Sequence, residues 1–513
     1  EVIRYSLATL LSLSLQIRDF ATSAIFWKGK GLFMNYSIIF YIVGWILNLE
    51  AAFMTLPCIT ALIYREKSGF AFLITMAICL AIGIPLTLKK PQKRAFYTKE
   101  GFVAVALSWI VLSIMGSVPF LLSGSISHPI DALFETVSGF TTTGASIISD
   151  VEILPHCILI WRSFTHWIGG MGVLVFILAL LPLAGGYHMN LMKAESPGPS
   201  VGKLVPKVQS TAKILYTIYF GLTMLQIILL LVGKMPLFDT LCISFGTAGT
   251  GGFGIRNDSL GGYSTYIQVV VTIFMILFGV NFNVYFLLLT KKFIQAFKVE
   301  ELRYYLGIIG ASILAIAINT AHMFDNIWTA LQQSAFQVGS IITTTGYATT
   351  DFNQWPVFSK TILVLLMFVG ACAGSTGGGI KVSRLIILFK TVAKELHLYL
   401  HPNAIKKIKM DQKTIPHEVV RSTNIFMAVY ILIFAGSVLI LGLDAYDLTT
   451  NFTAVAATLN NIGPGLELVG PTGNFSLFSP LAKCVLIFDM LAGRLEIFPL
   501  LLLFTKNTWK KFS

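Results

Sequence analysis

The stretch Phe140-Thr-Thr-Thr-Gly-Ala-Ser146 decides the fold, because stretches of the same kind occur at three later places in the chain. Each is short, polar and glycine-containing, and lies between a half-length apolar segment and a full-length one. Backbone without helix or sheet partners persists at membrane depth only where it is buried in protein or faces a watery path. We therefore interpret the four stretches as re-entrant loops, named loop 1 (141–144), loop 2 (249–252), loop 3 (343–346) and loop 4 (460–463).

The composition excludes a water-soluble globule. Hydrophobic residues make up 55% of the 513 residues, charged residues only 12%, and the mean hydropathy is +0.77. The net charge of +13 would suit nucleic acid, but the basic residues lie between apolar segments instead of forming one patch, so we expect no nucleic-acid partner. The six cysteines are scattered singly, which implies neither a metal site nor a disulfide framework.

Ten apolar stretches are long enough to span a bilayer, which takes about 20 residues of helix. The sequence therefore predicts an all-α polytopic membrane protein of about ten transmembrane helices, with four helix–pore loop–helix repeats around one central pore. The expected spans are 37–63, 69–88, 102–123, 157–183, 212–233, 264–290, 304–321, 360–396, 422–443 and 480–505.

The expected domains follow from the repeat. Residues 1–33 are expected to be an N-terminal appendage, because Met34 immediately precedes the first clear span; a short extra apolar segment at 6–16 is the alternative. The remaining domains are an accessory two-helix unit (34–95), pore repeat 1 (96–200), pore repeat 2 (201–300), pore repeat 3 with a glycine-rich break (301–415) and pore repeat 4 (416–513).

The connectors divide by charge. Those after 88, around 184–213, at 291–303, at 390–421 and after 505 are lysine-rich, which the positive-inside rule assigns to the cytoplasm together with both termini. The connectors that carry the loops are acidic, and we expect an outer rim that raises the local cation concentration, although solvated loop charge is the alternative for any one residue. The acidic residues are Asp131, Glu135, Asp150, Glu152, Asp239, Asp258, Asp325, Asp351, Asp444, Asp447 and Glu467.

Each loop is expected to point carbonyl groups at a central axis. Glycine permits the positive φ angles that such a tight turn requires, and a ring of carbonyls can replace the hydration shell of a small cation. The candidate cation-binding residues are Thr142, Thr143 and Gly144; Thr250, Gly251 and Gly252; Thr344, Thr345 and Gly346; and Asn461, Ile462 and Gly463.

These loops resemble the four filters of the Trk/Ktr/HKT potassium-transporter superfamily. Other stretches are similar to the bacterial TrkH type: Thr165-His-Trp-Ile-Gly-Gly-Met-Gly172, Ala194-Glu-Ser-Pro-Gly-Pro199, Gly374-Ser-Thr-Gly-Gly-Gly-Ile-Lys381 and Gly493-Arg-Leu-Glu-Ile497. The resemblance implies a potassium-uptake subunit of the bacterial inner membrane. It also implies a homodimer and a cytoplasmic regulatory subunit of the TrkA type, with the nucleotide on that partner alone. Potassium is then the transported ion, and no prosthetic group is expected.

Selectivity is expected to favour potassium and rubidium, though less strongly than in tetrameric potassium channels. One glycine in each loop leaves fewer closely spaced carbonyl rings than the TVGYG filter. In plant relatives, a serine in the first filter is linked with sodium permeation, and Gly144 stands at that position here.

The eighth expected span contains a glycine-rich run at 370–379. Each glycine makes a continuous helix less favourable by roughly 1 kcal/mol. We expect the helix to break there. The resemblance makes this segment an intramembrane gating loop, and a packing kink is the alternative; a phosphate loop is excluded because no Gly-Lys-Ser/Thr follows. The candidate gating residues are Gly370, Gly374, Ser375, Thr376, Gly377, Gly378, Gly379, Lys381 and Arg494.

Two charged or titratable residues lie inside expected spans. The resemblance places Arg494 near the pore, where it would repel a cation; an ion pair with Glu496 or Asp489 is the alternative. His166 could sense protons, but a hydrogen-bonded packing histidine is the favoured interpretation.

Three classes of function suit such a protein: a channel-like potassium-uptake protein, a secondary transporter with discontinuous helices, and a membrane enzyme. Parallel repeats favour the first and inverted repeats the second, while symport with H⁺ or Na⁺ stays open. An enzyme has no support, because the intramembrane polar residues form no catalytic arrangement.

Overall fold

The structure is a computed structural model that describes residues 35–88, 98–172 and 208–509. The expected appendage (1–33) and the motif at 194–199 lie outside the described residues. The described residues are mostly helical, and the strands among them form one two-stranded antiparallel hairpin.

Three described helices precede the first repeat. The helices α2 and α3 count together as one span of 29 residues, and α4 packs along α2. The bounds are α2 Tyr36–Phe53, α3 Thr55–Tyr64 and α4 Gly69–Leu88.

Each of the four later units has an outer helix, a short pore helix that ends at a loop, and a second helix. Their bounds are α5 Thr98–Leu122, α6 Pro129–Phe140 and α7 His156–Gly170; α10 Val208–Val232, α11 Leu237–Gly249, α12 Thr265–Phe278, α13 Phe282–Leu289 and α14 Phe293–Lys298; α15 Glu300–Thr320, α16 Ile327–Ile342, α17 Val357–Val369 and α18 Val382–Leu400; and α19 His417–Leu441, α20 Leu448–Leu459, α21 Pro480–Arg494, α22 Phe498–Phe504 and α23 Lys506–Trp509. The hairpin joins β1 Lys409–Met410 to β2 Lys413–Thr414, and short 3₁₀ turns lie at Ala321–Met323, Phe352–Gln354, Gly442–Asp444, Glu467–Val469 and Phe475–Leu477.

Several expected spans are not continuous helices. Six helices among the described residues are long and apolar enough to cross a membrane, and the pair α12 and α13 would add a seventh span with a bend of 93°. The eighth expected span breaks between Val369 and Val382, as the glycine run predicts, and the last one breaks between Arg494 and Phe498. The expectation of an unbroken sixth span was wrong, because the helix stops at Gly279 and restarts after Asn281.

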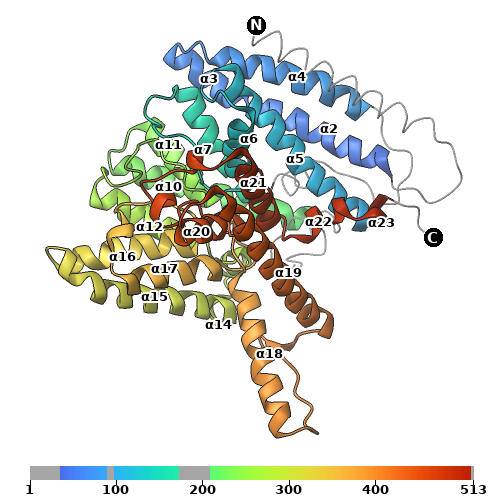
Figure 1. Cartoon of the computed structure of the whole chain (residues 1–513), viewed down its shortest axis with the longest axis vertical. Helices are drawn as coiled ribbons and strands as arrows, with labels where there is room; N and C mark the ends of the chain where they lie inside the picture. The colour runs from blue at the N-terminus through green and yellow to red at the C-terminus, as the bar shows by residue number, and fades with distance from the viewer. Residues whose placement is uncertain (1–34, 89–97, 173–207, 510–513) are drawn as a thin grey trace, which may run out of the picture.

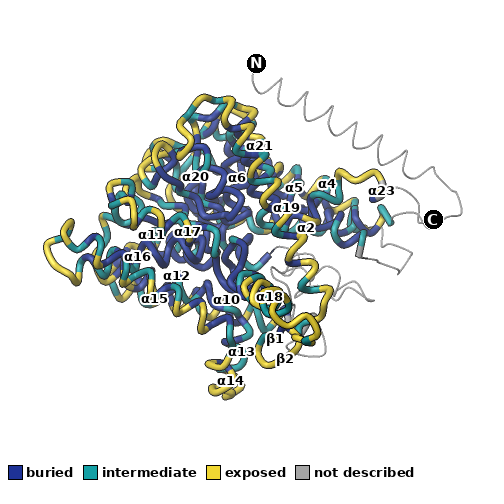
Figure 2. The backbone as a smooth tube through the Cα atoms, turned by 60° about the horizontal axis from the view of Figure 1, so that its bottom comes forward, coloured by how far each residue is buried: buried dark blue, intermediate teal, exposed yellow. Residues whose placement is uncertain are grey.

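The pore helices pack in a cycle. The second helix of each repeat lies against the pore helix of the next repeat: α7 against α11, α12 against α16, α17 against α20, and α21 against α6. The last of these contacts joins the fourth repeat to the first, so the four repeats surround a shared centre. The pore helices are largely buried there, as the dark blue tube in Figure 2 shows.

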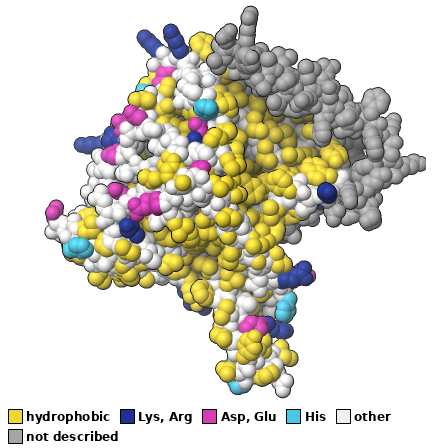
Figure 3. Space-filling view, viewed as in Figure 1, with side chains coloured by type: hydrophobic (Ala, Val, Ile, Leu, Met, Phe, Trp, Pro, Cys, Tyr) yellow, Lys and Arg dark blue, Asp and Glu magenta, His cyan; other side chains and the backbone are white. Residues whose placement is uncertain are grey.

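The outer surface is that of a membrane protein. Figure 3 shows a broad hydrophobic face over the helices, with acidic side chains gathered toward one edge. The helix α18 extends beyond the body of the molecule (Figure 1) and exposes large apolar side chains along its length.

Candidate functional site

All four pore helices end in the same hydrogen-bonded turn. The second residue of each glycine loop has a left-handed backbone, and the N–H of the residue after it bonds a carbonyl five residues back, which is the Schellman pattern. The four bonds run from Thr143 to Ser138, from Gly251 to Gly246, from Thr345 to Ser340 and from Ile462 to Ala457, each with an N···O distance of 2.8 Å.

The loops share their dihedral angles as well as their hydrogen bonds. The φ angles are +57° and +77° at Thr142 and Gly144, +55° and +77° at Thr250 and Gly252, +59° and +87° at Thr344 and Gly346, and +55° and +104° at Asn461 and Gly463. Four segments of different sequence therefore adopt one backbone conformation. Threonine and asparagine accept the left-handed angle because the tertiary packing around them holds it.

The glycines show that the loops meet in a ring. A Cβ atom on each glycine would strike the carbonyl oxygen just before the glycine of the next loop, in strict cyclic order. The distances from the built Cβ are 1.9 Å from Gly144 to Gly251 O, 1.9 Å from Gly252 to Thr345 O, 2.1 Å from Gly346 to Ile462 O and 2.8 Å from Gly463 to Thr143 O. Loop 4 thus returns to loop 1, and the predicted cation-binding residues of all four loops come together at one place.

The arrangement suits a small cation. The carbonyl ends of four helices point toward the loops that follow them, and a helix C-terminus carries roughly half a negative charge. The hydroxyls of Thr141 and Thr143 in loop 1 lie 2.7 Å apart and those of Thr343 and Thr345 in loop 3 lie 2.8 Å apart, so these pairs brace the turns. The remaining hydroxyls of these loops, on Thr142 and Thr344, accept hydrogen bonds from Arg494 and from the Gly378 N–H. Backbone oxygens are therefore the groups left to face an ion.

The segment from Gly370 to Lys381, called the 370–381 loop, packs against loops 3 and 4. The N–H of Gly378 donates to the Thr344 hydroxyl over 2.6 Å, and the N–H of Gly379 donates to the Asn460 carbonyl over 3.0 Å. Positive φ angles at Gly370, Gly374 and Gly379 reverse the chain inside the break, which a helix of L-residues could not do. The loop therefore lies against one side of the ring.

Arg494 reaches the same place from the end of α21. Its guanidinium donates to the Thr376 carbonyl over 2.9 Å, to the Thr142 hydroxyl over 3.4 Å and to the Gly169 and Gly170 carbonyls. Glu496, the suggested ion-pair partner, instead pairs with Arg384, and Asp489 accepts a hydrogen bond from Ser437. Arg494 therefore lies beside loop 1 and the 370–381 loop, and neither of its suggested ion-pair partners pairs with it.

The comparisons with known proteins give the family. The sequence model of TrkH, described as a cation transport protein, matches residues 68–511. The chain belongs to the TrkH family. The Trk system potassium uptake protein TrkH of Salmonella typhimurium is 39% identical over 485 residues, which cover 93% of this chain and 100% of that protein. The TrkH of Escherichia coli K12 is 38% identical over 487 residues with the same coverage.

A solved structure agrees with this assignment. The crystal structure of the potassium transporter TrkH from Vibrio parahaemolyticus matches with a TM-score of 0.84 at 35% identity, over 93% of this chain and 100% of that one. The chain is therefore a multi-pass membrane protein of a family of transport proteins, which fits the expectation that it is not an enzyme.

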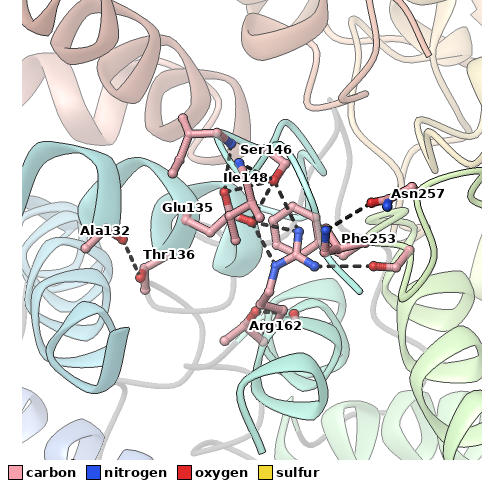
Figure 4. A network of polar contacts seen from close by, with 12 residues as sticks. Ala132, Glu135, Thr136, Ser146, Ile148, Arg162, Phe253 and Asn257 are labelled. Carbon is pink, nitrogen blue, oxygen red and sulfur yellow. Dashed lines mark hydrogen bonds and ion pairs between the residues drawn. The ribbon is translucent and has the colours of Figure 1, made fainter. Parts of the chain in front are cut away.

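The sequence did not predict a buried ion pair that lies behind loops 1 and 2 of this TrkH-family chain. Arg162 on α7 donates to Glu135 on α6, with Nε and Nη2 each 2.8 Å from Oε1, and the two side chains are 2% and 0% exposed. The Glu135 carboxylate also accepts from Ser146, and the guanidinium stacks 4.2 Å from the Phe253 ring centre. The pair thus fixes the chain that follows loop 1 against the chain that follows loop 2 (Figure 4).

This pair corrects part of the expected acidic rim. Glu135 is buried and neutralised, and Asp131 pairs with Lys483 of α21 over 2.6 Å. A cavity of about 590 Å³ is lined by Glu152, Asp239 and Asp258, but Arg256 and His156 line it too. The negative field on this side therefore comes from fewer carboxylates than the sequence predicts.

His166 packs against loop 2. Its ring lies edge-on to Phe253 at 4.3 Å between centroids, and a Cβ on Gly251 would overlap its Nδ1 atom. The histidine is a packing residue in this position, but the expected hydrogen bond is wrong: neither ring nitrogen has a partner among the described residues.

Proposed function

We propose that this chain mediates potassium uptake across the bacterial inner membrane, with ions passing through the ring formed by loops 1 to 4. The observation that carries the proposal is the cyclic contact of the four loop glycines with the carbonyl before the next glycine. The relatives named above are potassium uptake proteins, which supports potassium as the ion. An inside-negative potential, worth about 2.3 kcal/mol per charge per 100 mV, drives uptake.

The ring acts as the selectivity filter. Peptide oxygens replace water around a bare monovalent cation, and the C-terminal ends of α6, α11, α16 and α20 add favourable potential. Each loop contributes one glycine, so the filter offers few stacked carbonyl layers, and its preference for potassium and rubidium over sodium is moderate.

The 370–381 loop and Arg494 act as the gate. The loop lies against loops 3 and 4, and the Arg494 guanidinium joins loop 1 to the Thr376 carbonyl. A positive charge in this position repels a cation that has left the filter. Uptake then requires the 370–381 loop to move and Arg494 to leave its carbonyl partners.

The proposed assembly is a homodimer with a cytoplasmic nucleotide-binding regulatory subunit of the TrkA type. Support for self-association comes from an exposed apolar stripe at helical spacing on α18, made of Phe389, Val392, Leu396 and Tyr399. The lysine-rich connectors, with both termini, face the cytoplasm, where Lys406 and Lys407 offer an acidic partner complementary charge.

A secondary transporter is the less favoured function. Such proteins place one substrate site between inverted repeats, whereas here the four loops share one conformation and follow one another around a ring. Coupling to H⁺ or Na⁺ would be added to this ring and would not replace it.

The test is rubidium uptake into proteoliposomes under an imposed inside-negative potential, with sodium as competitor. The wild type is expected to accumulate rubidium in preference to sodium. Gly144→Ser is expected to reduce this preference, because its Cβ would lie 1.9 Å from the Gly251 carbonyl oxygen. The matched control is Gly436→Ser on α19, where the new Cβ meets nothing within 4 Å. Equal behaviour of both variants, or uptake of sodium as readily as rubidium by the wild type, would refute the proposal.

A further inference from the structure

Two adjacent carboxylates at the start of α15 connect the 370–381 loop to the hairpin formed by β1 and β2. Glu301 is buried, with 2% of its surface exposed. One of its oxygens, Oε1, accepts the Ala373 N–H over 2.7 Å and the Ser383 N–H over 3.1 Å. Ala373 lies inside the loop and Ser383 in the first turn of α18, so one atom holds both flanks of the break.

The other oxygen of Glu301 reaches the second broken span. Oε2 accepts from the side-chain amide of Asn281 over 3.3 Å, and Asn281 caps α13 through the Asn283 N–H over 2.9 Å. The backbones are also joined directly, since Cys372 donates to the Gly279 carbonyl and Phe282 donates to the Gly374 carbonyl. The bend between α12 and α13 and the 370–381 loop therefore meet at Glu301.

Glu300 makes contacts of a different kind. Its carboxylate pairs with Lys390 of α18 over 2.5 Å, and Lys390 also donates to the Lys409 carbonyl over 2.7 Å. The Glu300 N–H donates to the Asp411 carboxylate over 2.7 Å, and the Asp411 N–H returns a bond of 3.4 Å to Glu300. Asp411 lies in the turn between β1 and β2, so Glu300 fastens the hairpin to α15.

We propose that Glu300 and Glu301 couple the hairpin and α18 to the 370–381 loop, with Glu301 as the positioning residue that keeps the loop against the ring. The residues are neighbours on one helix, so a displacement of the hairpin or of α18 changes the position of both carboxylates. A partner that pulls on this surface thereby withdraws the acceptor from Ala373 and Ser383. The inference rests on the proposed gating role of the loop.

The contacts of Glu301 explain why its charged carboxylate is buried. Each N–H that Glu301 accepts belongs to a break in a helix, where no intrahelical carbonyl is available. A carboxylate accepts several such donors at once and forms stronger bonds than a neutral group does. Replacing it leaves the buried N–H groups of the loop without their acceptor, so the loop is released and not merely repacked.

Cys372 provides a native reporter for this release. Its thiol lies within the loop and is fully buried. The experiment measures the rate at which a hydrophilic thiol reagent labels Cys372, resolved by peptide mass spectrometry on the full-length protein in proteoliposomes. Rubidium uptake without any regulatory partner is measured on the same samples, with sodium uptake alongside. The variants are Glu301→Gln, Glu301→Ala and Asp411→Ala, with Glu418→Gln on the exposed start of α19 as the control.

For Glu301→Ala, the rate of Cys372 labelling is expected to rise about tenfold. A tenfold change in the equilibrium between the closed and open loop corresponds to the loss of about one charge-assisted hydrogen bond. Glu301→Gln and Asp411→Ala give smaller rises, partner-independent rubidium uptake increases in parallel, and rubidium preference stays as in wild type. Unchanged labelling in the Glu301 variants overturns the inference. A rise accompanied by lost ion preference also overturns it, because it shows general loosening of the ring. Absence of rubidium uptake by the wild type and by every variant contradicts the proposed function, while the labelling still decides the coupling.

Discussion

The side-chain amide of Asn461 donates to the Thr143 hydroxyl over 2.9 Å. This bond joins loop 4 to loop 1, although the two residues lie 318 positions apart in the sequence. The same amide group donates to the Met490 carbonyl over 2.9 Å. Asn461 also occupies the left-handed position of its turn, with φ at +55°, and asparagine tolerates that region better than most residues. One side chain therefore closes the ring and anchors it to α21.

Asn461→Asp is expected to destabilise this closure. The aspartate keeps the shape but loses the amide donor, so the buried Met490 carbonyl loses its partner at a cost of about 1–3 kcal/mol. We expect a lower melting temperature in detergent and a weaker preference for rubidium over sodium. The same substitution at the exposed Asn403 is the control and is expected to change neither quantity. Wild-type melting and ion preference in Asn461→Asp would show that the bond does not support the ring.

The Arg162–Glu135 pair is expected to behave as a buried ion pair. Removing one partner leaves an uncompensated charge and typically costs about 3–5 kcal/mol. Arg162→Met and Glu135→Gln should each lower the melting temperature strongly, and the double variant should recover part of the loss because neither charge then remains. Thermal melting of the four proteins checks this cycle. A double variant that loses the sum of the single effects would mean that the two side chains act independently.

Sequence patterns revealed the local features of the site and missed those that depend on distant contacts. The four loop glycines and the break at 370–379 were predictable, because closely spaced glycines within an apolar stretch disfavour a continuous helix. Glu135 was assigned to the rim because its sequence neighbours resemble an outer connector, and its partner Arg162 lies on another helix. The sequence around Glu301 indicates only an acidic helix start. Its role could not be predicted, because its hydrogen-bond partners come from distant segments at 281, 373 and 383.

The unexpected break in the sixth span has a similar cause. The residues on both sides of Gly279 and Asn281 are apolar, so the hydropathy of the sequence stays high across the bend and does not reveal it. The backbone groups freed there are bonded by Cys372 and Gly374, from a loop almost a hundred residues later. Only the folded arrangement shows that the two breaks support each other.

Stability is expected to depend on Glu66 and on pH. This carboxylate lies between α3 and α4 and accepts the N–H groups of His156 and Cys157 at the start of α7. Partial burial by itself would raise its pKa, but these hydrogen bonds, with Cys157 first, lower the pKa below the ordinary value of 4.5. A lowered pKa means that the stabilisation is present above 4.5 and is lost as the pH falls through the folded-state value.

Glu66→Gln should therefore melt at a lower temperature than wild type near neutral pH, and the difference should shrink as the pH is taken below 4.5. Thermal melting of both proteins across this range is the measurement. Asp325→Asn, in an exposed turn, serves as the control and should show no such trend. A difference that grows on acidification would contradict the assignment of the carboxylate as the stabilising form.

The most direct test of the ring compares rubidium over sodium preference in Gly144→Ala, Gly252→Ala, Gly346→Ala and Gly463→Ala. Every variant places a Cβ against the neighbouring loop and at a positive φ. An L-residue in that backbone region costs about 1–2 kcal/mol, which changes an equilibrium constant by roughly 5- to 30-fold. The account predicts a loss of preference in all four variants, smallest at Gly463, where the contact is longest. Wild-type preference in any of the first three variants would show that its loop does not belong to a shared filter.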